Sequence, residues 1–268
     1  MKIRLGCRAS ANVELALDPP GSRLSYNTAF VTPNWEGLRM GATALDLKLN
    51  RETGFYRSLV GRKAIVAVTG AMLFAYLVAH LLGNLQIFAG PERLNAYARL
   101  LHSQPLLLWV ARLVLLTAAG LHIIATVQLW FESRAARPIR YQKAETLQAT
   151  LASRTMILTG PLIAAFIVYH ILHFTTGAAH PQFHELNVYN NVVLGFQRPA
   201  ASGFYILIMV VIGLHLYHGL WSMFQSLGLN HPRYTPWIKR CGAAGAFLIA
   251  GGNILIPIAV LAGFIRPV

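Results

Sequence analysis

The sequence predicts an all-α membrane protein with five transmembrane helices, and three observations predict it. First, 55% of the 268 residues are hydrophobic and only 12% are charged, about half the charged share of a typical soluble domain. Second, five apolar stretches each reach the roughly 20 residues that a helix needs to cross a bilayer. Third, these stretches are continuously apolar rather than alternating, which favours helices over the strands of a membrane barrel.

The five apolar stretches define a membrane domain over residues 61–268. Short polar connections separate them, and no internal repeat relates one stretch to another. The predicted spans are Arg62–Phe88, Pro105–Phe131, Met156–Thr176, Gly203–Leu227 and Cys241–Ile265.

The first 60 residues differ from the rest in composition. They contain Pro19, Pro20, Pro33 and scattered charges, and no apolar core of the signal-peptide kind. We therefore expect a partly irregular cytoplasmic arm over 1–60, with at most one surface helix near Leu45–Leu59.

The basic residues predict an orientation rather than a nucleic-acid partner. The net charge is +14, but the cations lie at the ends of apolar runs and not along one polar face, so we expect no nucleic acid. By the positive-inside rule the N-terminus is cytoplasmic, the C-terminus is outside, and the chain is a multi-pass protein of the cell inner membrane. The other side has only Arg93, Arg99 and Arg198. The cations on the predicted cytoplasmic side are Arg51, Arg57, Arg62, Lys63, Arg134, Arg137, Arg140, Lys143, Arg154, Arg233, Lys239 and Arg240.

Six of the ten histidines lie inside predicted spans, and four of them fall at two depths. With a rise of ~1.5 Å per residue, His80 and His170 lie ~24 Å and ~21 Å from the cytoplasmic starts of their helices. By the same arithmetic His122 and His215 lie only ~14 Å and ~18 Å above the cytoplasmic ends of theirs. Four successive helices thus offer two histidines at an outer level and two at a middle-to-inner level.

This grouping is what two stacked haems would require. A low-spin haem b takes one imidazole from each of two facing helices, and four-helix bundles build such sites from inward-facing side chains. The alternative for any single histidine is a hydrogen bond to a neighbouring helix. Four histidines at two matched depths favour the haem interpretation, with the first four helices forming a haem-binding bundle.

Several stretches together resemble the single-chain, five-helix diheme cytochrome b anchor of the succinate dehydrogenases and fumarate reductases, the complex II family. The resemblance covers residues 57 to 265, and its most specific parts surround His80 and His215. The stretches that carry it are GRKAIVAVTGAMLFAYLVAHLLGNLQIF, NAYARLLH, LTGPLIAAFIVYHILHF and GLHLYHGLWSMFQSLG.

The resemblance implies a function and a set of ligands. It implies two haems b, with His80 and His170 as axial ligands of the outer iron and His122 and His215 as ligands of the inner iron. It implies an electron-transfer subunit of a succinate:quinone oxidoreductase, whose quinone is more often menaquinone than ubiquinone. The succinate-oxidising site would belong to a flavoprotein, joined through an iron–sulfur subunit on the cytoplasmic side, so this chain would hold no catalytic residue.

Four other residues are candidates for contact with quinone or a haem propionate. His173 and His218 each follow a proposed ligand by three residues and so lie on nearly the same helix face; a hydrogen bond to a neighbouring helix is the alternative for both. His102 and Arg62 stand at opposite ends of the membrane domain. For His102, a solvated position at the membrane surface is the alternative.

The sequence departs from part of the family in its acidic residues. Relatives that carry protons across the membrane have a glutamate two residues before the fourth-helix ligand, where this chain has Gly213. No Asp or Glu lies inside the five predicted spans, so we expect no carboxylate relay through the bundle.

Two other classes of protein remain as alternatives. One is the cytochrome b anchor of a formate dehydrogenase or hydrogenase. The other is a haem-free scaffold or transporter, for which Pro257 and Gly251–Gly252 in the fifth span are the main sign of a broken helix. Cys7 and Cys241 match no metal-binding spacing, and no dinucleotide fingerprint is present, so flavin and iron–sulfur clusters would belong to partners.

Overall fold

The computed structural model describes residues 54–136 and 150–268, and every regular element in these ranges is a helix. Five of the helices are long and apolar enough to cross a membrane, which confirms the predicted all-α membrane fold. The predicted arm falls almost wholly outside the described residues. So do Cys7, Arg51 and the loop cations Arg137, Arg140 and Lys143.

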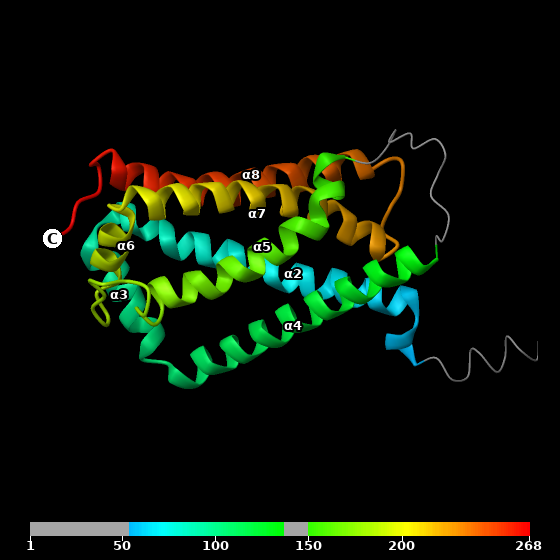
Figure 1. The fold of residues 1–268 in the computed structure, drawn as a ribbon, viewed down its shortest axis with the longest axis horizontal. Coiled ribbons are helices and arrows are strands. Elements are labelled where there is room, and N and C mark those ends of the chain that lie inside the picture. Colours follow the sequence, from blue (N-terminus) through cyan, green and yellow to red (C-terminus); the bar gives the residue numbers. More distant parts are fainter. Residues whose placement is uncertain (1–53, 137–149) are drawn as a thin grey trace, which may run out of the picture. The chain divides into compact units, whose positions relative to one another are not determined.

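The five long helices alternate in direction along the chain (Figure 1). The helices α2, α5 and α8 finish at the end of the bundle that is predicted to face outside, and we call it the outer end. The opposite end is called the inner end. The long helices are α2 (Leu59–Asn84, continued by the 3-10 helix η2, Leu85–Ala89), α4 (Pro105–Ala135), α5 (Leu151–Phe174), α7 (Pro199–Ser226) and α8 (Thr235–Leu261).

Three of the helices begin at least four residues earlier than the apolar pattern predicted. The predicted starts were Met156, Gly203 and Cys241, whereas α5, α7 and α8 begin four to six residues before them. Capping sets these starts: the Thr150 side chain accepts a hydrogen bond from the backbone N–H of Ser153 before α5, and α7 and α8 each have a proline in their first turn. Hydropathy identifies the apolar part of a helix and does not locate its ends.

A cap of short elements covers the outer end, and the sequence did not predict it. It comprises α3 (Pro91–His102), α6 (Val188–Phe196), the α5–α6 loop and the tail after α8, which meet at one end of the bundle (Figure 1). Asn95 accepts a hydrogen bond from the Tyr189 backbone N–H, and Asn190 bonds the backbone of Val268. Both short helices were missed because neither is long enough to span a membrane.

The long helices pack unequally. α7 and α8 lie side by side, α2 packs on both α4 and α7, and α5 packs on α7. The buried core lies mostly between α5, α6, α7 and α8, around Phe166, Tyr205 and Ile256. Elsewhere large apolar side chains such as Leu116 and Phe247 are more than 70% exposed, as expected for surfaces that face lipid.

Candidate functional site

The outer pair of predicted histidines meets across two helices. His80 on α2 and His170 on α5 have ring centroids 5.8 Å apart, with the rings nearly perpendicular. One metal bound by two opposed imidazoles at about 2 Å each would separate the ring centroids by roughly 6 Å. The two rings therefore approach each other at the separation that a single iron between them needs.

Tyr205 of α7 joins two histidines of α5. Its hydroxyl lies 3.2 Å from Nδ1 of His170 and 3.1 Å from Nδ1 of His173. A phenol has one proton, so it donates to one of these rings and accepts from the other. The contact leaves Nε2 of His170 free to bind a metal.

His173 and His180 form a buried stack beneath the outer cap. Their ring centroids are 5.2 Å apart, and the side chains are 3% and 5% exposed. His180 Nδ1 accepts a hydrogen bond from the Gln182 backbone N–H, so its Nε2–H donates to the carbonyl oxygen of Asn191 at 2.9 Å. Both nitrogens of His180 are thus satisfied, which makes it a structural residue of the loop.

His80 lies against an aromatic ring rather than a polar group. Its ring stacks on Tyr76, one turn earlier in α2, with centroids 5.4 Å apart. Within the described part of the chain, no side chain or carbonyl forms a hydrogen bond with the His80 ring. Both of its nitrogens remain available for another ligand.

Threonines from neighbouring helices hold the inner pair of predicted ligands. Nδ1 of His122 lies 3.2 Å from both Thr69 Oγ1 and the carbonyl oxygen of Val66 on α2. The Thr69 hydroxyl donates to the Ile65 carbonyl oxygen at 2.6 Å, so its oxygen can only accept from His122. A Cβ on Gly70 would lie 3.3 Å from the same ring, which shows how closely α2 approaches it.

His215 repeats this arrangement on the other side of the bundle. Its Nδ1 lies 3.1 Å from Thr159 Oγ1 of α5, and that hydroxyl donates to the Met156 carbonyl oxygen. The Val66 carbonyl oxygen can only accept, so Nδ1 of His122 carries the proton and its Nε2 offers a lone pair, which is the tautomer of most metal-ligating imidazoles. The contact of His215 with Thr159 is compatible with the same tautomer. Unlike the outer pair, the rings of His122 and His215 make no direct aromatic contact with each other.

His218 has a different environment from His215. Its Nδ1 is buried and forms no hydrogen bond within the described residues. Its ring stands edge-on to Trp221 at 5.4 Å, and the Lys239 ammonium lies 4.8 Å from the centre of that indole. His218 thus lacks a hydrogen bond of the kind that Thr159 forms with His215.

The two remaining candidates have ordinary partners. Arg62 forms an ion pair with Glu132 of α4 at 2.7 Å, and its guanidinium also donates to the Arg57 carbonyl oxygen. Because α4 extends four residues beyond the predicted Phe131, Glu132 lies in the last turn of this helix, just outside the predicted span. His102 is exposed at the end of α3 and bonds the carbonyl oxygen of Ala98 in its own helix.

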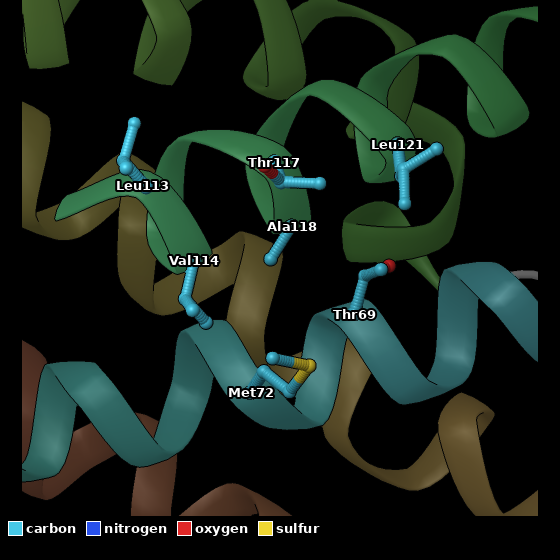
Figure 2. A pocket seen from close by; sticks show the side chains of 7 residues that line it. All are labelled: Thr69, Met72, Leu113, Val114, Thr117, Ala118 and Leu121. Atoms are coloured by element: carbon cyan, nitrogen blue, oxygen red, sulfur yellow. The ribbon is translucent and has the colours of Figure 1, made fainter. Parts of the chain in front are cut away.

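A groove of about 290 Å³ lies between α2 and α4 (Figure 2). The Thr69 and Met72 side chains point into it from α2, and Val114 and Ala118 face them from α4. Thr69 therefore links the groove to His122. The lining residues are Thr69, Met72, Leu113, Val114, Thr117, Ala118 and Leu121.

Sequence reasoning missed the three hydroxyl residues of these sites. Thr69, Thr159 and Tyr205 stand 53, 56 and 35 residues from their histidine partners. No spacing rule connects such distant positions. The only available signal was a polar side chain inside an apolar span.

The described histidines do not form a site for a bare metal ion. Over 54–136 and 150–268, no three His, Cys, Asp or Glu side chains converge as a bare metal ion would require. Haem iron brings four ligands in its macrocycle and needs only two from protein. The residues present, two per level with free Nε2 atoms, fit that group.

The fold and the site together define a membrane protein with five long apolar helices, in which His80 and His170 of two different helices lie in contact. No protein-family model, curated protein or solved structure matches the chain.

Proposed function

We propose that this chain is the diheme cytochrome b anchor of a complex II type enzyme. It would pass electrons between an iron–sulfur partner subunit and membrane quinone, menaquinone rather than ubiquinone. His80 and His170 would hold the outer haem, and His122 and His215 the inner one. The haems, when bound, supply one-electron transfer at two depths of the membrane.

The observation that carries this proposal is the approach of His80 and His170. Two imidazoles on different helices are costly to bury in a membrane unless they have a role. Their ring centroids lie 5.8 Å apart, whereas an ordinary structural histidine such as His180 has both nitrogens bonded to the backbone. An axial ligand pair accounts for both the proximity and the free nitrogens.

The inner level supports the same interpretation by a different route. His122 and His215 come from two helices, and each ring has its Nδ1 held by a hydroxyl from a neighbouring helix. A hydroxyl that accepts from Nδ1–H orients the ring and leaves Nε2 unprotonated. An imidazole must be in this state to bind iron.

The charge at the inner end supports a docked partner on that side. Among described residues, α2, α4, α5 and α8 present cations there, and Glu132 is already paired with Arg62. In the orientation predicted from the sequence this end would face the cytoplasm, where a flavoprotein and an iron–sulfur subunit would bind. The exposed cations are Arg57, Lys63, Arg134, Arg154, Arg233, Lys239 and Arg240.

The test is to purify the tagged chain from its native membrane and record a reduced-minus-oxidised spectrum together with the copurifying subunits. We expect haem b bands, a flavoprotein and an iron–sulfur protein, and succinate:quinone activity. Haem b with a different dehydrogenase would identify the anchor of a formate dehydrogenase or hydrogenase type enzyme instead. A spectrum without haem would favour a scaffold or transporter and contradict the proposal.

A further inference from the structure

We infer that Tyr205 is a positioning residue for His170, and that His173 completes the arrangement as the acceptor of the Tyr205 proton. The inference rests on the proposed function, because it concerns how this chain supports the outer iron. It assigns a role to His173 that is neither iron ligation nor contact with quinone.

The direction of the two hydrogen bonds follows from proton counting. A neutral imidazole that binds iron through Nε2 carries its proton on Nδ1, so His170 must donate to the Tyr205 oxygen. The Tyr205 proton is then free to point elsewhere, and Nδ1 of His173 is the acceptor 3.1 Å away. His173 therefore carries its own proton on Nε2, the opposite tautomer to His170.

The packing around Tyr205 keeps this relay in place. The Tyr205 side chain is 4% exposed and His173 is 3% exposed. The phenol ring packs edge-to-face with Phe166 and Phe196, with centroids 5.1 Å and 5.0 Å away. Within the described residues, the Tyr205 hydroxyl bonds only His170 and His173.

The relay strengthens the Tyr205 oxygen as a hydrogen-bond acceptor for His170. A hydroxyl that donates to an imidazole nitrogen becomes more negative at its oxygen, because successive hydrogen bonds polarise one another. A stronger bond to Nδ1–H raises the basicity of the ligand and stabilises oxidised iron. The chain thus lowers the midpoint potential of the outer centre through Tyr205 and His173.

The experiment is a redox titration of the purified complex with variants of this pair. Tyr205→Phe keeps the ring and removes the acceptor, so we expect both haems to remain and the outer midpoint potential to rise while the inner one stays unchanged. The outer low-spin EPR signal should shift in the same sample. His173→Phe removes only the second hydrogen bond and should give a smaller rise.

Two controls separate this effect from general disturbance. Tyr169→Phe removes a hydroxyl from the ring that stacks on His173 at 5.3 Å, and this hydroxyl bonds neither histidine, so both potentials should match wild type. Thr159→Val removes the acceptor of His215 and should shift only the inner potential.

The possible failures are distinguishable. A wild-type protein without haem would overturn the proposed function and this inference together. Two haems in wild type, with unchanged potentials and EPR signals in both Tyr205→Phe and His173→Phe, would overturn the inference alone. If Tyr205→Phe accumulates poorly, His173→Phe decides by itself. An outer midpoint potential equal to that of wild type in this variant would contradict the relay.

Discussion

The outer and inner histidine levels are built differently. At the outer level the His80 and His170 rings meet edge-to-face, Tyr76 stacks on His80, and Tyr205 bonds His170. At the inner level the rings of His122 and His215 make no aromatic contact with each other, and each is held by its own threonine. Tyr205 of the outer level belongs to the packed core, whereas Thr69 of the inner level lines the groove between α2 and α4.

This difference indicates how far the effect of a substitution extends at each level. A threonine that bonds its own helix backbone is a local support, so the loss of one inner contact affects one ring. Tyr205 supports two histidines and packs against Phe166 and Phe196. A change at the outer level therefore spreads to several neighbours, because contacting groups are energetically coupled.

The largest expected effect is the loss of one haem from one level. We expect His122→Ala or His215→Ala to remove the inner haem and to leave the outer one, because the two levels share no ligand. Low-temperature difference spectra of the purified variants measure this. Loss of the outer haem alone would mean that the pairing is wrong.

A second effect concerns the side of the membrane on which quinone reacts. If quinone reacts at the outer level, electrons from the inner end cross the membrane while protons are exchanged outside, so turnover moves charge. Succinate:quinone activity in sealed vesicles should then rise when an uncoupler is added. Equal rates with and without uncoupler would move the quinone site to the inner end, near Arg62.

The sequence predicted the two levels but not their supports. Depth along each helix follows from a fixed rise per residue, so the matching of His80 with His170 needed only the span boundaries. The rotation of each helix about its axis is set by tertiary packing, which one sequence does not reveal. For this reason the choice between His215 and His218 rested on resemblance, and the role of Thr159 could not be foreseen.

A third effect tests the choice of histidine within each pair. We expect His173→Ala and His218→Ala to keep both haems, because neither side chain is a proposed ligand. Absorption spectra of the two variants measure this, and loss of a haem in either would mean that the wrong member of the pair was chosen.

A smaller effect distinguishes His218 from His173 by stability. His218 has a buried Nδ1 without a partner, so His218→Leu should be neutral or stabilising by about 1 kcal/mol. His173→Leu loses the bond to Tyr205 and should destabilise by a similar amount. Thermal unfolding of the two variants in detergent, followed by circular dichroism, compares them. Destabilisation by His218→Leu equal to that of His173→Leu would contradict the assignment.

The smallest effect concerns the ion pair at the inner end. The side chain of Glu132 is 39% exposed, so solvent screens its attraction to Arg62, and Glu132→Gln should cost about 0.5 kcal/mol or less. Arg62→Gln should cost more, because that side chain is only 13% exposed and also bonds Arg57. A double-mutant cycle by thermal unfolding gives the coupling, and equal costs for the two single changes would contradict this ranking.

The ratio of haem to chain tests the central claim most directly. The account predicts two haems b per chain in the purified complex, measured as pyridine haemochrome against quantitative amino-acid analysis. It also predicts one haem in His80→Ala, one in His215→Ala, and none in the double variant. A ratio of one in wild type, or a ratio that either single substitution leaves unchanged, would contradict the assignment of two histidine pairs at two levels.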